Sequence, residues 1–242
     1  MTNSTLRWLI NFFLPPEGLQ MDLKRRSLLT TGVVGLGGGL LFRAHPLAGE
    51  AMNSPELIRP PGARAEHEFL AKCIRCGECM KVCPTNVIQI SMLEGGLAGM
   101  WSPVLKTEKK YCEYSCTMCS QVCPTQAIQP LSLEQKQKVR IGLAHIDKGR
   151  CLPYAYSRPC VVCAKACPLP EKAIWLEESK VTNSRGMQIA VRLPHVDAEI
   201  CIGCGVCQAK CTVSDQAAIR VTSVGETRNP KNRVLSGDQY GG

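Results

Sequence analysis

Residues 73–84 read CIRCGECMKVCP and carry the pattern that decides the fold. The cysteines Cys73, Cys76, Cys79 and Cys83 are separated by two, two and three residues, and Pro84 follows the last of them. A loop with this spacing can place three thiolates around three corners of a [4Fe–4S] cube, whereas the fourth cysteine points away and binds the other cluster of a pair. The stretch therefore predicts an iron–sulfur loop that needs a second loop as its partner.

The same pattern recurs three more times, and the four repeats contain all sixteen cysteines of the 242-residue chain. The second repeat has three residues in its first gap and the third has eight, while the fourth has the regular spacing but Thr212 in place of the proline. We therefore expect four [4Fe–4S] clusters, with all sixteen cysteines as their metal ligands. The further repeats are Cys112, Cys116, Cys119 and Cys123; Cys151, Cys160, Cys163 and Cys167; and Cys201, Cys204, Cys207 and Cys211.

Other uses of cysteine fit these spacings less well. Cysteine-rich secreted chains are normally disulfide scaffolds, but such frameworks rarely show one spacing four times with proline after three of the repeats. Structural zinc favours two C-x-x-C pairs separated by a longer loop, and the C-x-x-C-H motif of covalent haem does not occur. Because each cluster has a complete set of four cysteines, none keeps an open iron for catalysis. The sequence predicts an electron carrier without catalytic residues or a small-molecule substrate, and not an enzyme.

Two pairings of the repeats are compatible with the sequence. The first and fourth repeats share the regular spacing and the middle two are irregular, which favours a nested arrangement with the inner pair inserted in the outer pair. The alternative is sequential pairing, of the first repeat with the second and of the third with the fourth. Nesting predicts the ligand sets Cys73, Cys76, Cys79 with Cys211; Cys201, Cys204, Cys207 with Cys83; Cys112, Cys116, Cys119 with Cys167; and Cys151, Cys160, Cys163 with Cys123.

The expected fold class is α+β, with tandem or nested ferredoxin-like lobes whose small cores are built around the clusters. Aromatic residues make up only 5% of the chain, so a large apolar core is not expected. Strand-like segments lead into the last two repeats. A short β-prone segment also follows each repeat, at residues 86–90, 126–128, 172–176 and 217–221.

The clusters are expected to lie in a domain that covers residues 67–224. Residues 51–66 are predicted to be a linker in front of it, and residues 225–242 a flexible polar tail. Within the domain, Trp101, Trp175, Tyr111 and Tyr114 are expected to shield the clusters as part of the core, rather than to form a docking surface.

Residues 21–50 resemble a twin-arginine export signal. The basic run from Lys24 to Arg26 precedes an uncharged stretch, residues 27–42, that five glycines make only weakly hydrophobic. Such a signal suits cargo that folds around its clusters before export, and it is expected either to be cleaved or to stay as an anchor. Residues 1–20 form a hydrophobic extension, which is either a mis-assigned start before Met21 or a segment that lies on a membrane or partner.

The charge of the chain depends on its clusters. The formal net charge is +9 at pH 7, which alone suggests an acidic partner or a membrane surface. Four clusters would add about −8, because each cubane with four thiolates carries about −2, and would bring the loaded chain to about +1. No block of five or more like charges occurs, so nucleic-acid binding is not expected.

Several stretches together resemble the NapG/MauM family of periplasmic ferredoxin-type proteins, over roughly residues 55–222. Their order and spacing carry the resemblance, while Thr212 makes the fourth repeat less typical. The stretches are RPPGA (59–63), EFLAKCIRCGECMKVCP (68–84), KKYCEYSCTMCSQVCPTQAI (109–128), CLPYAYSRPCVVCAKACP (151–168) and CIGCGVCQAKC (201–211).

The resemblance implies four [4Fe–4S] clusters on the periplasmic side of the cytoplasmic membrane, after export in the folded state. It implies two partners: a polytopic membrane ferredoxin of the NapH type that takes electrons from quinol, and a periplasmic cytochrome or reductase, such as a nitrate reductase, that accepts them. Two alternatives stay open, namely a maturation or assembly factor for a periplasmic redox enzyme and the iron–sulfur subunit of a molybdoenzyme complex.

Overall fold

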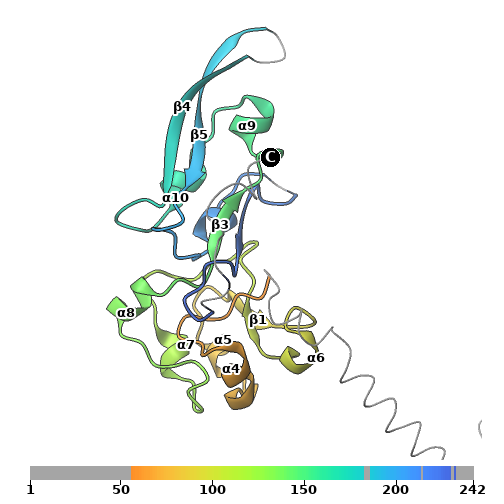
Figure 1. Ribbon diagram of the computed structural model, residues 1–242, viewed down its shortest axis with the longest axis vertical. Helices are drawn as coiled ribbons and strands as arrows, with labels where there is room; N and C mark the ends of the chain where they lie inside the picture. Colours follow the sequence, from red (N-terminus) through yellow and green to blue (C-terminus); the bar gives the residue numbers. More distant parts are fainter. Residues whose placement is uncertain (1–55, 183–185, 214, 230–231, 233–242) are drawn as a thin grey trace, which may run out of the picture. The chain divides into compact units, whose positions relative to one another are not determined.

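Short helices and short antiparallel strands alternate along the chain, which confirms the expected α+β class (Figure 1). The computed structural model describes residues 56–182, 186–213, 215–229 and 232, all of them within the unit Leu47–Gly242. The predicted extension, residues 1–20, and the predicted leader, residues 21–50, lie outside the described residues. In the part of the chain that is described, no helix is long and apolar enough to cross a membrane.

The same unit, a cysteine loop followed by a helical turn or two, occurs four times. Helices α5, α7, α10 and α11 each carry the third cysteine of one repeat. The helices are α4 (Glu66–Lys72), α5 (Glu78–Lys81), α6 (Gly96–Gly99), α7 (Met118–Gln121), α8 (Leu133–Lys138), α9 (Leu152–Tyr156), α10 (Val162–Ala166) and α11 (Val206–Ala209). The strands are β1 (Ile88–Ile90), β2 (Pro103–Leu105), β3 (Leu143–Ile146), β4 (Ile174–Thr182), β5 (Gln188–Val196) and β6 (Ile219–Thr222).

The strands connect the first two repeats in the same way as the last two. The segment after the first repeat, β1, pairs with the segment before the second, β2, and β4 pairs with β5 in the corresponding places. Outside the repeats, β3 precedes the third and pairs with β6 after the fourth. The equivalent contact in the first half is the antiparallel bridge between Ala63 and Ile128. Backbone pairing therefore joins consecutive repeats.

Three of the four predicted strands that follow a repeat are formed, in β1, β4 and β6, and β3 and β5 are the strands expected before the last two repeats. The predicted strand at residues 126–128 is only the bridge at Ile128. The reason is local, because Gln126 has a left-handed φ of 53°, which an extended strand excludes. Asn86, with φ 52°, likewise delays the start of β1.

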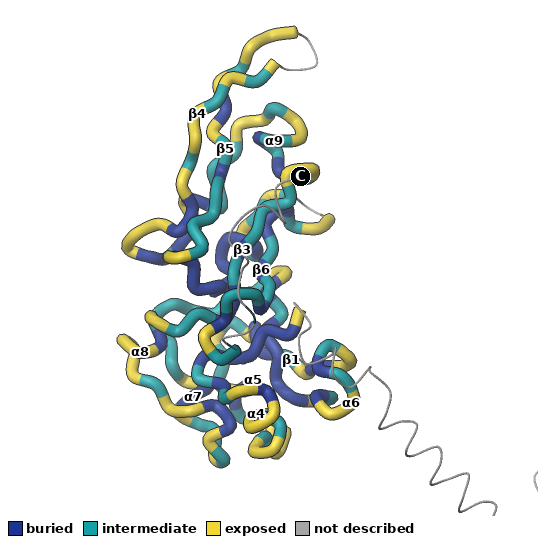
Figure 2. The backbone as a smooth tube through the Cα atoms, viewed as in Figure 1, coloured by how far each residue is buried: buried dark blue, intermediate teal, exposed yellow. Residues whose placement is uncertain are grey.

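One apolar core cluster extends under the cysteine loops of both halves. Phe69 is its largest fully buried apolar side chain, and the strand residues Leu105 and Ile219 are also buried. The long hairpin β4–β5 projects from this core and is largely exposed along β4 (Figure 2). The predicted burial of the two tryptophans is wrong: Trp101 is 59% exposed, and Trp175 is 51% exposed and stacks on a histidine of the neighbouring strand. Tyr111 and Tyr114 are partly buried and pack against the core cluster.

The segment expected to be a linker, residues 51–66, belongs to the core from Leu57 onward. Buried Arg59 donates from Nη2 and Nε to the two carboxylate oxygens of Glu66, at 2.5 and 3.1 Å. Its Nη1 donates to Ser102 Oγ at 2.8 Å and to the carbonyl of Pro103 at 2.7 Å. A buried guanidinium has five donors that need acceptors, and those of Arg59 bind Glu66, Ser102 and Pro103. These bonds hold the segment in the fold, so the linker prediction is wrong for these residues.

The start of the predicted flexible tail, residues 225–242, is also packed. Arg228 lies with Nη1 2.5 Å from the carboxylate of Glu66 and with Nε 2.8 Å from that of Glu226. Burial favours the neutral form of Glu66, but Arg59 and Arg228 outweigh this effect and lower its pKa. The tail prediction is wrong for residues 225–229, and residues 233–242 lie outside the described part.

Candidate iron–sulfur sites

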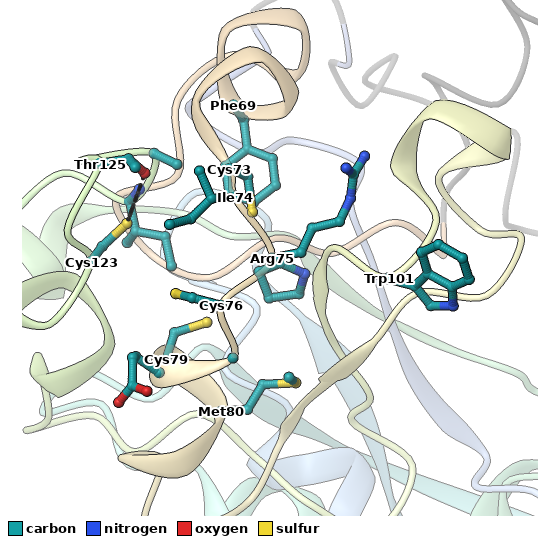
Figure 3. A pocket seen from close by; sticks show the side chains of 15 residues that line it. Phe69, Cys73, Ile74, Arg75, Cys76, Cys79, Met80, Trp101, Cys123 and Thr125 are labelled. Carbon is teal, nitrogen blue, oxygen red and sulfur yellow. Dashed lines mark hydrogen bonds between the residues drawn. The ribbon is translucent and has the colours of Figure 1, made fainter.

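The sixteen cysteines form four groups of four, and each group lines a pocket of its own. In the first group, the sulfur atoms point toward a common space (Figure 3). We number each site by the repeat that supplies three of its cysteines. Site I is Cys73, Cys76, Cys79 and Cys123; site II is Cys83, Cys112, Cys116 and Cys119; site III is Cys151, Cys160, Cys163 and Cys211; and site IV is Cys167, Cys201, Cys204 and Cys207.

Each site thus combines three cysteines of one repeat with the fourth cysteine of an adjacent repeat. The nested pairing is wrong, since Cys211 lines site III instead of site I and Cys83 lines site II instead of site IV. The exchange of Cys123 and Cys167 between the middle repeats is wrong for the same reason. Similar spacing reflects a similar local loop, whereas the choice of partner follows the strand pairs that join consecutive repeats.

The fourth cysteine of a repeat reaches the neighbouring site because the chain leaves the helix there. Cys167 ends α10 in an extended conformation, with φ −59° and ψ 122°, and Pro168 follows. A residue before proline is disfavoured in the helical region, and proline itself cannot continue the helix. In the first three repeats, the proline therefore favours a chain path that directs the thiol away from its own loop, whereas Cys211 reaches site III with Thr212 after it.

Glycine shapes the loops of the two regular repeats. Gly77 and Gly205 stand between the second and third cysteines, with φ of 80° and 82°, and cap the N-termini of α5 and α11. Only glycine adopts this region without a steric cost. A Cβ on Gly205 would also lie 2.6 Å from Cγ2 of Thr107. The irregular repeats have Thr117 and Val161 at this point with negative φ, so the differences in spacing accompany real differences in loop shape.

Burial and crowding make most of these thiols hard to ionise without a metal. Burial, followed by the charge of neighbouring cysteines, raises the pKa of Cys79 to about 12. Burial likewise raises the pKa of Cys151 and of Cys204 to about 12. Metal ligation requires thiolates, so cluster binding must release these protons and supply the positive charge that holds four anions together.

Cys83 is different, and it points to residues that the sequence reasoning missed. Burial disfavours its thiolate, but hydrogen bonds from Thr85 and from nearby backbone N–H groups outweigh this and lower its pKa. The hydroxyl of Thr85 donates to the carbonyl of Tyr111 at 2.6 Å and lies 3.5 Å from Cys83 Sγ, and that of Thr125 lies 3.8 Å from Cys123 Sγ. The sequence could have indicated these threonines, because the tripeptide C-P-T ends both of the first two repeats.

The pockets suit a compact inorganic cluster. Besides the cysteines, the walls of each pocket are mainly apolar, such as Ile146 and Pro153 in site III. Within the described residues, no group of three or more His, Cys, Asp or Glu side chains is placed to hold a metal ion. A cubane makes a different demand from a single ion, because each thiolate binds a separate iron at its own corner. The donor set of every pocket fits a [4Fe–4S] cluster.

The sites adjoin one another in the order I, II, IV, III. Cys79 of site I is among the charges that, after burial, raise the pKa of Cys119 in site II. The backbone N–H of Cys112 in site II donates to the carbonyl of Cys204 in site IV at 2.8 Å. Cys163 of site III in turn contributes, after burial, to the raised pKa of Cys207 in site IV.

The two ends of this order are more open than site IV. All four cysteines of site IV are buried, whereas Cys76 of site I is exposed. At the other end, Cys160 of site III also lines a wider groove, together with hairpin residues 178–180 and 190–192. Site I thus has an exposed cysteine, and site III adjoins a surface groove through Cys160.

Known proteins with similar sequences agree with this chemistry. The model of the 4Fe-4S dicluster domain matches residues 72–127, which contain the first two repeats. The methylamine utilization ferredoxin-type protein MauM of Methylorubrum extorquens is 32% identical over 221 residues, which cover 87% of this chain and 96% of that protein. The chain belongs to the NapG/MauM family of ferredoxin-type proteins. It is therefore an iron–sulfur protein of the ferredoxin type, with [4Fe–4S] clusters as its cofactors.

Other members of the family show the same relation. The ferredoxin-type protein NapG of Escherichia coli is 36% identical over 165 residues, which cover 68% of this chain and 69% of that protein. MauM of Methylobacillus flagellatus is 34% identical over 208 residues, covering 85% and 83% of the two chains. No solved structure matches the chain.

Proposed function

We propose that the chain holds four [4Fe–4S] clusters, one in each of sites I to IV, and relays single electrons between two redox partners. The observation that carries this proposal is the division of all sixteen cysteines into four complete sets, arranged in the continuous order I, II, IV, III. A bound [4Fe–4S] cluster supplies one-electron redox chemistry. Since each set has four thiolates, no iron is left open for a substrate, and the role is electron transfer without catalysis.

The residues of the chain would hold the clusters, space them and exclude water. Three cysteines of each loop bind one cluster, and the fourth ties that repeat to its neighbour, so each pair of repeats is cross-linked through its cofactors. Apolar walls keep water from most of the cluster surface, and backbone N–H donors near the sulfur atoms, such as that of Ile128 to Cys123 Sγ, adjust its potential. The direct backbone contact of Cys112 with Cys204 holds sites II and IV together at the junction of the two pairs.

The proposal extends to location and partners. The basic run and weakly hydrophobic stretch of residues 21–50 support export by the twin-arginine route and a place on the periplasmic side of the membrane. Electrons would come from a quinol-oxidising membrane partner of the NapH type and pass to a periplasmic cytochrome or reductase, such as a nitrate reductase. Sites I and III, at the ends of the order, are the places where the two partners would dock.

Affinity purification of the tagged full chain from solubilised membranes without oxygen tests this function. Recovery of a membrane ferredoxin together with a cytochrome or reductase is the expected result. Rapid-mixing experiments should then show that the clusters are reduced and reoxidised at the turnover rate of the pathway. Recovery with chaperones and an unassembled enzyme, and no electron transfer at that rate, would instead establish a maturation factor.

A further inference from the structure

Helix α8 lies in the insertion between the second and third repeats and buries a single lysine. Its start is fixed by a capping box, in which Ser132 and Gln135 exchange hydrogen bonds between side chain and backbone. The sequence LEQKQK is almost wholly polar and most of the helix is exposed, yet Lys136 is only 3% exposed. A lysine is rarely buried to this extent without a partner for its charge.

The ammonium of Lys136 points at the loop of site II. Its Nζ donates to the backbone carbonyls of Glu113 and Tyr114, at 2.5 and 2.9 Å, and lies 5.6 Å from the centre of the Tyr114 ring. Both carbonyls belong to the segment between Cys112 and Cys116, two of the ligands of site II. The lysine therefore fixes the irregular part of this loop, which has one residue more than the regular repeats.

No carboxylate of the described residues forms an ion pair with Lys136. Glu113 is the nearest in the sequence of the loop, but its carboxylate accepts a hydrogen bond from the backbone N–H of Tyr114 at 3.0 Å. Removing an ammonium from water is costly unless an opposite charge compensates. At this position, the charge of Lys136 acts on site II: burial raises the pKa of Cys112, and Lys136 opposes that effect.

Site IV occupies the equivalent place in the second pair of repeats and has a different cationic neighbour. Burial raises the pKa of Cys201 there, and the charge of Arg140 opposes that effect. The side chain of Arg140 is partly exposed, however, and its Nη2 lies 3.3 Å from the carboxylate of Glu199. A paired and solvated cation acts on a nearby cluster much less than a buried, unpaired one. The two inner sites therefore differ in electrostatic environment although their ligands correspond.

We propose that Lys136 is a positioning residue that provides the buried counter-charge of site II and raises its reduction potential above that of site IV. This inference rests on the proposed function in so far as it assumes a cluster in each site. Reduction adds one negative charge to the cluster, and a fixed cation in a buried setting favours the more negative state. Of the two inner clusters, that of site II is then reduced first.

Redox titration of the anaerobically prepared full chain with chemical mediators, followed by electron paramagnetic resonance, tests this inference without any partner. The signals of sites II and IV are assigned with the ligand variants Cys116→Ser and Cys204→Ser. Lys136→Met should shift the reduction equilibrium of site II toward the oxidised form by about tenfold, or about 59 mV for one electron. Lys136→Arg, which keeps the charge, should shift it less.

Lys138→Met is the matched control, because Lys138 lies on the same helix and is exposed. It should leave all potentials unchanged. If Lys136→Met gives no folded protein, the unaltered chain still provides a test, since site II must have a higher potential than site IV. Equal potentials, the reverse order, or equal shifts for Lys136→Met and Lys138→Met would overturn the proposal. A failure of the proposed function gives a different result, namely a purified protein with fewer than four clusters.

Discussion

At the scale of single residues, Glu66 is the centre of an ion-pair network with two arginines. Its carboxylate pairs with buried Arg59 and with partly buried Arg228, which come from the two ends of the described chain. Glu66→Gln leaves the buried guanidinium of Arg59 without a counter-charge, whereas Arg228 keeps the carboxylate of Glu226. The change should lower the free energy of unfolding by about 3–5 kcal/mol. Denaturant titration of the holoprotein without oxygen measures the loss.

Glu68→Gln is the control for this prediction. Glu68 pairs with Arg64 one helical turn away, and its side chain is about half exposed. Such surface pairs contribute less than about 1 kcal/mol, so this variant should remain close to the unaltered protein. Equal losses for the two variants would show that the buried network does not stabilise the fold.

The network also predicts a dependence on pH. The pKa of Glu66 is lowered in the fold, where the two arginines outweigh the effect of burial. Its stabilising contribution is therefore present above the unfolded pKa, near 4.5, and is lost as the pH falls through the lower folded value. The stability gap between the unaltered protein and Glu66→Gln should narrow below about pH 4.5. A gap that stayed constant or widened in acid would contradict this assignment.

Single ligand changes test the pairing of the repeats. Cys211→Ser should alter the cluster signal of site III, because Cys211 lines that pocket, and Cys123→Ser should alter that of site I. Signals are assigned with Cys163→Ser and Cys76→Ser, and the spectra of the reduced proteins are compared. An effect of Cys211→Ser confined to site I would restore the nested pairing and refute the sequential one.

At the scale of elements, the loop that leads into α11 packs more closely against its neighbours than the loop that leads into α5. Gly77→Ala and Gly205→Ala both place a side chain at positive φ, which costs roughly 1–2 kcal/mol. Only the second also brings a Cβ to within 2.6 Å of Thr107, whereas the first meets the flexible end of Met80 at 3.4 Å. Gly205→Ala should therefore be the more destabilising in denaturant titration, and the reverse order would show that α11 can move away from Thr107.

At the scale of the whole molecule, the sequence was sufficient for what is local and insufficient for what is tertiary. Spacing and proline predicted the cysteine loops, and β-prone segments predicted most strands, because both depend on neighbouring residues. Pairing could not be predicted from spacing, because it depends on which strands meet, such as β3 with β6. Lys136 and Arg59 carried no signal either, since each is buried only by contacts with segments far along the chain or across the fold.

The central claim is that one chain holds four [4Fe–4S] clusters in four complete cysteine sets. Iron and acid-labile sulfide, measured against protein concentration in the full chain purified without oxygen, test it most directly. About sixteen irons and about sixteen sulfides per chain are expected. A protein that, after cluster reconstitution, still held eight irons or fewer, or that held zinc or disulfides in place of sulfide, would contradict it.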